Sequence, residues 1–252
     1  GVNLHGIHKL DQPILVAVGD RVRMQGEPLA VVAAEDIETV NTALKLITAT
    51  YTPLPIIDDP IKASKDDSPL LHPERFAKEY EFVCGDVEKA LLESDVIIDY
   101  GIDIPRQEHA YIETEAGISY YDPDGILTSF SQSQEPFNIR HQIARTLSLP
   151  VGKVRAIVPP LGGAFGGKQN MTVHLHSAII TYITKRPVQM IWSREESFLF
   201  SVKRHPGYID CKVGAMRDGT INAVKIDFTL DAGAYTEHSP GVTMAVGQGA
   251  VG

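Results

Sequence analysis

Four glycines within six residues constrain this chain more than any other feature of its sequence. They lie in Gly162-Gly163-Ala164-Phe165-Gly166-Gly167-Lys168, after a β-branched stretch at 154–158 and before a stretch at 171–185 with apolar residues at helical spacing. The pattern predicts a strand, a tight loop and a helix, with the loop carrying the N-terminal end of that helix. Backbone amides and the positive end of the helix dipole gather at such an end. We therefore expect the loop to bind an anionic group such as a phosphate, a carboxylate or a metal oxo group.

Two other interpretations of this loop are weaker. A phosphate-binding P-loop matches as far as Lys168, but it next needs Ser or Thr to hold magnesium, and the chain has Gln169. The dinucleotide-binding pattern G-x-G-x-x-G also fails, because Ala164 occupies its middle position. A glycine-rich turn that serves only tight packing explains one or two of the glycines but not four.

The loop and a second segment together resemble a known family. With Arg106-Gln107-Glu108-His109-Ala110-Tyr111-Ile112-Glu113, the loop is similar to the N-terminal portion of the molybdenum-binding subunit of the xanthine dehydrogenase and aldehyde oxidase family, the molybdenum hydroxylases. Shorter matches in the same order extend the resemblance over nearly the whole chain: Val18-Gly19-Asp20, Gly26-Glu27-Pro28-Leu29, Ser133-Gln134-Glu135-Pro136, Arg204-His205-Pro206, Lys212-Val213-Gly214 and Asp231-Ala232-Gly233-Ala234-Tyr235. Each match is weak alone, but their order and spacing are specific.

The resemblance implies an oxidoreductase that hydroxylates a carbon next to nitrogen or oxygen, with water as the source of oxygen. It implies a molybdenum-pterin cofactor of the molybdopterin cytosine dinucleotide type, with [2Fe-2S] clusters and FAD on partner chains. Cys84 and Cys211 are too few and too far apart in the sequence to hold an iron–sulfur cluster or a zinc ion. We therefore expect three partners: a second molybdopterin-domain segment or subunit, an iron–sulfur subunit and a FAD subunit.

The resemblance also assigns roles to particular residues. Gln107 matches the glutamine whose side-chain amide donates to the apical oxo ligand, which it can do without adding charge. Phe165 and Gly166 match the positions whose backbone amides approach the oxygen ligands of the molybdenum. The other expected cofactor-binding residues are Gly163, Ala164 and Gly167.

Two glutamines bear on the substrate. Gln134 matches a family position near the substrate channel. Gln169 departs from the family pattern, because purine-hydroxylating members commonly carry an acidic residue there. An amide can hydrogen-bond a heterocycle but cannot act as an acid or a base. We expect an N-heterocycle of the xanthine or nicotinate type as the substrate, with an aldehyde or an aromatic acyl-CoA thioester as alternatives within the family.

Other titratable residues are weaker candidates. Glu113 and Glu115 lie two apart on an extended stretch, which fits a catalytic carboxylate pair or, equally, a solvated strand face. His174 and His176 lie two apart in a predicted helix, so they diverge by about 200° and cannot share a metal ion. His109 is expected to be structural.

Patterning predicts an α+β fold. Residues 1–62 form a small α/β unit, which the resemblance identifies as an α/β hammerhead domain whose start is missing. Residues 63–94 form a polar connector with a short helix. Residues 95–252 form the first part of a mixed-sheet molybdopterin-binding domain.

The expected elements follow from periodicity, caps and turn residues. They are strands at 14–18, 29–34 and 96–104, helices at 37–49, 85–93 and 137–148, and hairpins around Asp122-Pro123-Asp124-Gly125 and Met216-Arg217-Asp218-Gly219.

Charge and length exclude several functions. With 23 basic and 32 acidic residues and a net charge of −9, the chain does not suit a nucleic-acid or anionic lipid surface. No apolar run approaches the roughly 20 residues of a membrane helix, and no signal peptide is present, so a cytoplasmic protein is expected.

The family's base glutamate and substrate-binding arginine lie in later segments than this chain contains. We therefore expect the first portion of a catalytic subunit, inactive by itself, from either a split subunit or a fragment of a longer polypeptide. A scaffold domain that kept the fold but lost the cofactor is the alternative outside enzymes.

Overall fold

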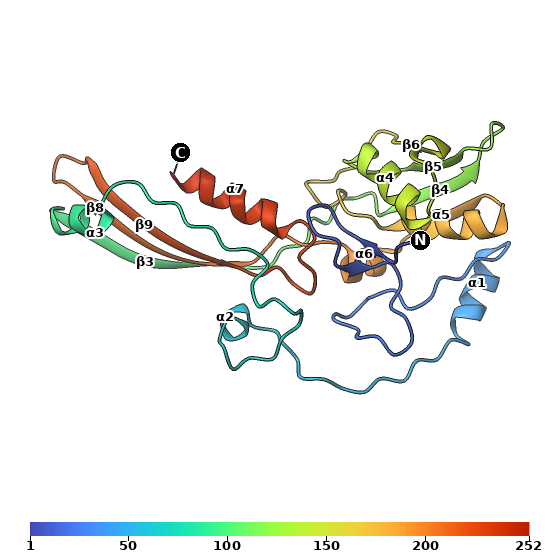
Figure 1. Cartoon of the computed structure of the whole chain (residues 1–252), viewed down its shortest axis with the longest axis horizontal. Coiled ribbons are helices and arrows are strands. Elements are labelled where there is room, and N and C mark those ends of the chain that lie inside the picture. Colours follow the sequence, from blue (N-terminus) through green and yellow to red (C-terminus); the bar gives the residue numbers. More distant parts are fainter. Residues whose placement is uncertain (252) are drawn as a thin grey trace. The chain divides into compact units, whose positions relative to one another are not determined.

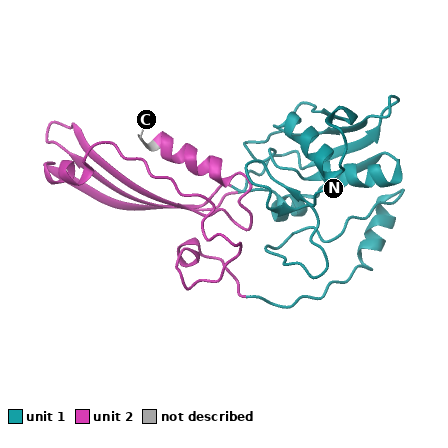
Figure 2. Cartoon of the chain, in the orientation of Figure 1, with its two compact units in different colours: residues 1–54, 108–203 teal, residues 55–107, 204–252 magenta. Residues whose placement is uncertain are grey.

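A four-stranded sheet and a three-stranded sheet organise the two units into which the chain divides (Figures 1 and 2). The computed structural model describes residues 1–251. Unit 1 comprises residues 1–54 and 108–203, and unit 2 comprises residues 55–107 and 204–252. Each unit is thus built from two separate stretches of sequence. The domain boundaries after residues 62 and 94 remain predictions.

The sheet of unit 1 has the strand order β6-β5-β4-β7. β4 pairs antiparallel with β5 and with β7, whereas β5 and β6 are parallel. The strand bounds are β4 Ala116–Tyr121, β5 Leu127–Ser131, β6 Val154–Ile157 and β7 Val188–Ile191. This arrangement is a mixed sheet, as the sequence predicted.

The predicted hairpin between β4 and β5 is confirmed, and its turn residues explain it. The side-chain Oδ1 of Asp122 accepts hydrogen bonds from the backbone N–H groups of Asp124 at 3.0 Å and Ile126 at 2.9 Å. Gly125 adopts a φ of 72°, which a residue without Cβ reaches at no steric cost. The turn therefore sets the register of the two strands.

Two helices join the strands of this sheet and bury its core. α4 (Pro136–Thr146) connects β5 to β6, and α5 (Val173–Thr184) lies between β6 and β7; both pack on the sheet. α4 starts with a proline at its first turn, where the missing N–H costs nothing. The shared core contains Leu127, Ile139, Ile143, Val154, Met171 and Leu175, each at most 2% exposed.

The first 54 residues are less regular than predicted. Their elements are β1 Leu4–His5, β2 Gln12–Pro13 and α1 Ile37–Leu44. The helix expected at 37–49 is thus present but shorter, and the strands expected at 14–18 and 29–34 are absent from the described residues. One backbone bond, from Val16 N to Pro28 O at 2.9 Å, joins the first stretch to the residue just before the second. Pro28 has no N–H, so it cannot return the bond that would continue a ladder.

Unit 2 contains the sheet β3-β8-β9, which is antiparallel throughout. Its strands are β3 Val96–Ile104, β8 Gly207–Ala215 and β9 Ile221–Leu230. The prediction for 96–104 is confirmed to the residue, and the second predicted hairpin is confirmed, with Gly219 at φ 93°.

The helices of unit 2 are α2 Pro60–Ala63, α3 Val87–Leu92 and α7 Ser239–Val251, and unit 1 adds α6 Arg194–Phe200. In residues 1–251, no helix is long and apolar enough to cross a bilayer.

The two faces of the unit 2 sheet differ in chemistry. Cross-strand partners point to the same face, so Asp99, Lys212 and Lys225 share one face, where Lys212 pairs with Asp99 at 2.9 Å. α3 lies over that face, because its Leu91 approaches Gly214. We call the opposite side the apolar sheet face. It comprises Val96, Ile98, Tyr100, Ile102, Ile104, Ile209, Cys211, Val213, Val224, Ile226, Phe228 and Leu230.

Candidate functional site

The glycine loop, residues 162–168, lies between β6 and α5, but it does not carry the N-terminus of α5. That helix begins at Val173, and its N-cap residue Thr172 has a non-helical backbone, with φ −122° and ψ −108°. The backbone N–H of Thr172 donates to His174 Nδ1 at 3.2 Å. The expectation that this loop delivers a helix N-terminus was therefore wrong, because four residues lie between Lys168 and the first helical residue, Val173.

Two of the four glycines are required by close packing. An ideal Cβ on Gly162 would lie 2.5 Å from the Cβ of Glu113, and one on Gly167 would lie 2.8 Å from Cε1 of Tyr111. Both distances are shorter than real Cβ contacts allow. The loop is thus seated directly on the segment 109–113, which the family resemblance had singled out for other reasons.

The other two glycines are required by backbone conformation. Gly163 has a φ of 98° and Gly166 a φ of 91°, both in the region that side chains with a Cβ avoid. Phe165 between them also has a positive φ, 53°, and its side chain is 75% exposed. A bulky residue held there is strained, and such strain collects at functional sites.

The turn leaves backbone donors unpaired. The N–H of Gly167 donates to Ala164 O at 2.8 Å, but within residues 1–251 the N–H groups of Phe165 and Gly166 donate to no acceptor. Unpaired amides at a turn with left-handed residues are suited to anionic oxygen atoms. In the same described range no three His, Cys, Asp or Glu side chains are grouped to hold a metal ion. The donor set therefore suits anionic oxygen atoms of a ligand, such as those of a phosphate, a carboxylate or a metal oxo group.

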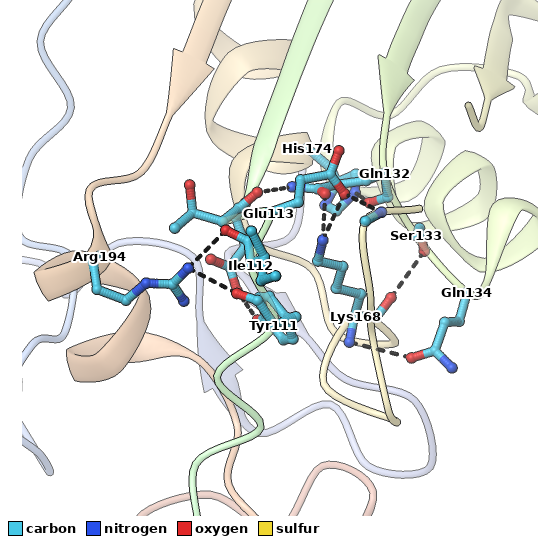
Figure 3. A network of polar contacts seen from close by, with 12 residues as sticks. Tyr111, Ile112, Glu113, Gln132, Ser133, Gln134, Lys168, His174 and Arg194 are labelled. Atoms are coloured by element: carbon cyan, nitrogen blue, oxygen red, sulfur yellow. Dashed lines mark hydrogen bonds and ion pairs between the residues drawn. The ribbon is translucent and has the colours of Figure 1, made fainter. Parts of the chain in front are cut away.

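A buried lysine holds the far end of the loop (Figure 3). The side chain of Lys168 is 1% exposed, and its Nζ donates to Glu113 Oε2 at 2.8 Å and to Gln132 Oε1 at 2.5 Å. The ammonium also lies 4.5 Å from the ring centroid of Tyr111. A charge this buried is stable only when it is paired and hydrogen-bonded, and both conditions are met here.

Glu113 and Glu115 do not form a carboxylate pair with each other. Glu113 bonds Lys168 and the N–H of Gly162, whereas the buried Glu115 accepts the hydroxyl hydrogen of Tyr111. Burial alone would raise the pKa of Glu113, but the hydrogen bonds from Lys168 and Gly162 outweigh it and hold that pKa below its usual value. Burial, and then the bond to Glu115, raise the pKa of Tyr111.

The two histidines of α5 contact different partners, as predicted. His174 Nε2 lies 2.8 Å from Gln132 O, and His176 Nε2 lies 2.9 Å from Ile14 O. Both rings are buried, and burial lowers both pKa values, that of His174 to about 4. His109 stacks on Tyr111 with ring centroids 6.4 Å apart, which agrees with a structural role.

The three predicted glutamines are placed in different ways. Gln107 belongs to unit 2, where its backbone O accepts from Arg204 N at 3.0 Å, and its side chain bonds nothing within the described residues. Gln134 belongs to unit 1 and lies beside the loop; its Oε1 accepts from Lys168 N at 3.3 Å. Gln169 follows the loop, half-buried, and its side chain likewise has no bonding partner in residues 1–251.

Sequence reasoning missed the residues that support the loop. Lys168 was considered only as part of a P-loop pattern, and Gln132 was not considered. Arg194 was also missed, although its guanidinium donates to Tyr111 O at 2.7 Å and Ile112 O at 2.8 Å. A lysine directly after a glycine loop, followed by the apolar pattern at 171–185, was the one available signal.

Comparison with known proteins gives one consistent result. The family model described as "Molybdopterin cofactor-binding domain" matches residues 71–252. The chain is 41% identical over 245 residues to the nicotinate dehydrogenase large molybdopterin subunit of Eubacterium barkeri, covering 96% of this chain and 57% of that protein. It is 29% identical over 231 residues to the xanthine dehydrogenase molybdenum-binding subunit of Escherichia coli O157:H7, covering 90% of this chain and 30% of that protein.

Solved structures agree on the fold. The aldehyde oxidoreductase from Desulfovibrio desulfuricans ATCC 27774 superposes with a TM-score of 0.82 at 22% identity, over 91% of this chain and 27% of that chain. The chain therefore spans 57%, 30% and 27% of the lengths of these three proteins.

Proposed function

The chain belongs to the molybdopterin cofactor-binding domain family, and on this premise we propose that it is part of the catalytic subunit of a molybdenum hydroxylase. The observation that carries the proposal is the exposed turn of the glycine loop, where the N–H groups of Phe165 and Gly166 have no acceptor within the described residues. When bound, the molybdenum-pterin cofactor supplies the oxidation of a C–H next to nitrogen or oxygen, with water as the oxygen source.

The residues of this chain hold and orient that group in our proposal. The backbone N–H groups of Phe165 and Gly166 would donate hydrogen bonds to oxygen ligands of the bound cofactor, and Gly163, Ala164 and Gly167 shape the turn. Gln107, in unit 2, is proposed separately as an uncharged side-chain donor to an oxo ligand. Preorganised donors of this kind act strongly because they need no rearrangement when charge develops on an oxygen. Molybdopterin cytosine dinucleotide is the cofactor form that we propose.

An N-heterocycle is the substrate class that we propose. The relative with the higher identity of the two reported above is named for nicotinate. Gln169 supports this class, because its side-chain amide makes no hydrogen bond within the described residues and can both donate to and accept from a ring nitrogen or carbonyl. Gln134 could contribute a second amide. An aldehyde or an aromatic acyl-CoA thioester is the alternative within the family.

The apolar sheet face supports the proposal of a partner segment. Five of its side chains, those of Val96, Ile98, Tyr100, Ile102 and Val224, are 43–56% exposed. A continuous exposed apolar surface of this kind marks an interaction site. Because the chain spans only 57% of the nicotinate dehydrogenase large subunit, we propose that a second molybdopterin-domain segment covers this face. Iron–sulfur and FAD subunits are the further partners that we propose. We also propose, as a separate point, that residues 1–62 form an α/β hammerhead domain.

Molybdenum analysis of the complex purified through this chain from its native source tests the proposal. We expect stoichiometric molybdenum, together with iron–sulfur and flavin chains in the mass spectrum. A complete complex without molybdenum would instead support a scaffold that lost its cofactor.

A matched pair of variants then tests the loop. Gly166→Val places a branched side chain beside the amides, whereas Gly125→Val introduces the same left-handed strain in the β4–β5 turn, where an added Cβ meets nothing within 4 Å. Only Gly166→Val should lose molybdenum. Equal molybdenum content in both variants would remove the loop from the cofactor site.

A further inference from the structure

One carboxylate oxygen joins both ends of the glycine loop. Glu113 Oε2 accepts a hydrogen bond from the backbone N–H of Gly162 at 2.8 Å and another from Nζ of Lys168 at 2.8 Å. The backbone of Glu113 adds a third contact, because its N–H donates to Gly162 O at 3.4 Å. The first and last residues of the loop are therefore held by the same residue, which comes from a segment about 50 residues earlier in the chain.

The Lys168 end of the loop is fixed on its other side by the segment that follows β5. Lys168 O accepts from Gln134 N at 2.9 Å and from Ser133 Oγ at 3.2 Å, and Lys168 N donates to Gln134 Oε1. Its Nζ bonds Gln132 Oε1, and Gln132 O in turn accepts from His174 on α5. Figure 3 shows Glu113 and Gln132 converging on the same ammonium group.

One residue between these two ends has an unfavourable backbone conformation. Gly163 and Gly166 reach positive φ at no steric cost, whereas Phe165 also has a positive φ, and its exposed phenyl ring obtains little packing energy there. Strained conformations persist only where the surrounding structure over-determines them. In this loop the contacts that impose the conformation are made by the two ends, Gly162 and Lys168, and not by the residues between them.

We propose that Glu113 is a positioning residue that ties the two ends of the glycine loop together and thereby sets the direction of the Phe165 and Gly166 amides. It does not contact the reacting groups itself. The inference rests on the proposed function only for the identity of the ligand that those two amides bind.

Hydrogen exchange of the purified complex tests the proposal with two variants. Glu113→Met removes the tie but leaves the Lys168 ammonium buried without its ion partner, which destabilises the surroundings as well. The double variant Glu113→Met, Lys168→Met removes the unpaired charge and keeps the tie broken. Exchange is followed at the amides of Gly167 and Lys168, whose acceptors are not on Glu113, and, for the stability of the sheet and its helices, at α4.

In the double variant, amide exchange in the glycine loop and in α4 should respond differently. We expect α4 to recover the exchange rate of the wild type, while the loop amides exchange about tenfold faster and molybdenum is lost more readily on gel filtration. Wild-type exchange in the loop would overturn the proposal. A parallel increase in the loop and in α4 would also overturn it, because Glu113 would then contribute only ordinary stability.

A control variant removes an ion pair elsewhere in unit 1. Arg155→Met deletes the 2.5 Å pair with Asp122 in the β4–β5 hairpin and should leave the exchange of the loop unchanged. If the complex contains no molybdenum at all, the proposed function fails, but the exchange measurement still decides the role of Glu113.

Discussion

Acid should destabilise unit 1 through His174, and the hydrogen bonds of its ring explain why. Nδ1 accepts the N–H of Thr172 at 3.2 Å, so Nε2 must carry the proton that it donates to Gln132 O at 2.8 Å. The neutral ring thus uses both nitrogens. A second proton would have to replace the Thr172 bond inside a site that is 2% exposed. Burial accordingly lowers the pKa of His174 from 6.5 to about 4.

The size and sign of the effect follow from this shift. Between pH 6.5 and pH 4 the unfolded chain binds a proton at His174 and the folded chain does not, so the free energy of unfolding falls as the pH falls. The stability contribution is complete above pH 6.5 and is lost toward pH 4. At 1.36 kcal/mol per pH unit, a change from pH 7 to pH 5 costs about 2 kcal/mol. With ordinary denaturant slopes, the urea midpoint should move by about 1 M.

The assay compares the wild type with His174→Gln. The amide of glutamine can still donate to Gln132 O but does not titrate in this range. The only tryptophan, Trp192, is 8% exposed and lies in unit 1, so its fluorescence follows the unfolding of that unit. The buried His5 and His176 are present in both proteins, and their contributions cancel in the comparison. Equal losses of stability in the two proteins between pH 7 and pH 5 would refute the reasoning.

Two further substitutions probe the contacts beneath the loop, and both can be measured by urea unfolding followed at Trp192. Gly162→Ala should lower the free energy of unfolding by about 1–3 kcal/mol, because the new Cβ would lie 2.5 Å from that of Glu113. Gly152→Ala is the control and should be neutral, because its new Cβ meets nothing within 4 Å. Similar losses of stability in the two variants would contradict the packing account. Tyr111→Phe should cost about 1.5–3 kcal/mol, because it removes the hydroxyl that donates to the 2% exposed carboxylate of Glu115. Tyr120→Phe is its control, and an equal loss there would count against a special role for the Tyr111 hydroxyl.

Regular elements were predictable where local chemistry determines them. The strand at 96–104, both hairpins and the helix after Pro136 follow from alternation, turn glycines and a proline at a first helical turn, and each was found. The strands expected at 14–18 and 29–34 are equally apolar in sequence. Pairing there depends on a reciprocal bond that Pro28 cannot donate, and apolar composition alone does not reveal this.

The candidate site was predictable only in part for a different reason. The loop and Gln107 were identified from motifs, but the partners of Lys168 lie 55 residues away at Glu113 and 36 residues away at Gln132. A single sequence contains no signal that links such positions. The four glycines illustrate the same limit, because the packing of Gly162 and Gly167 became evident only when the segment 109–113 was seen beneath them.

Hydrogen-bond satisfaction divides the residues of the site into two groups. The charged side chains Lys168 and Glu113 are paired with each other and hold the loop. The backbone N–H groups of Phe165 and Gly166 and the side-chain amide of Gln169 have no hydrogen-bond partner among the described residues. An unpaired donor is tolerated where solvent or a ligand can reach it, but it gives no energy to hold a strained turn. The side chains of Lys168, 1% exposed, and Glu113, 38% exposed, must therefore supply the order that the exposed donors need, so substitutions of this pair should weaken ligand binding although neither residue carries one of those donors.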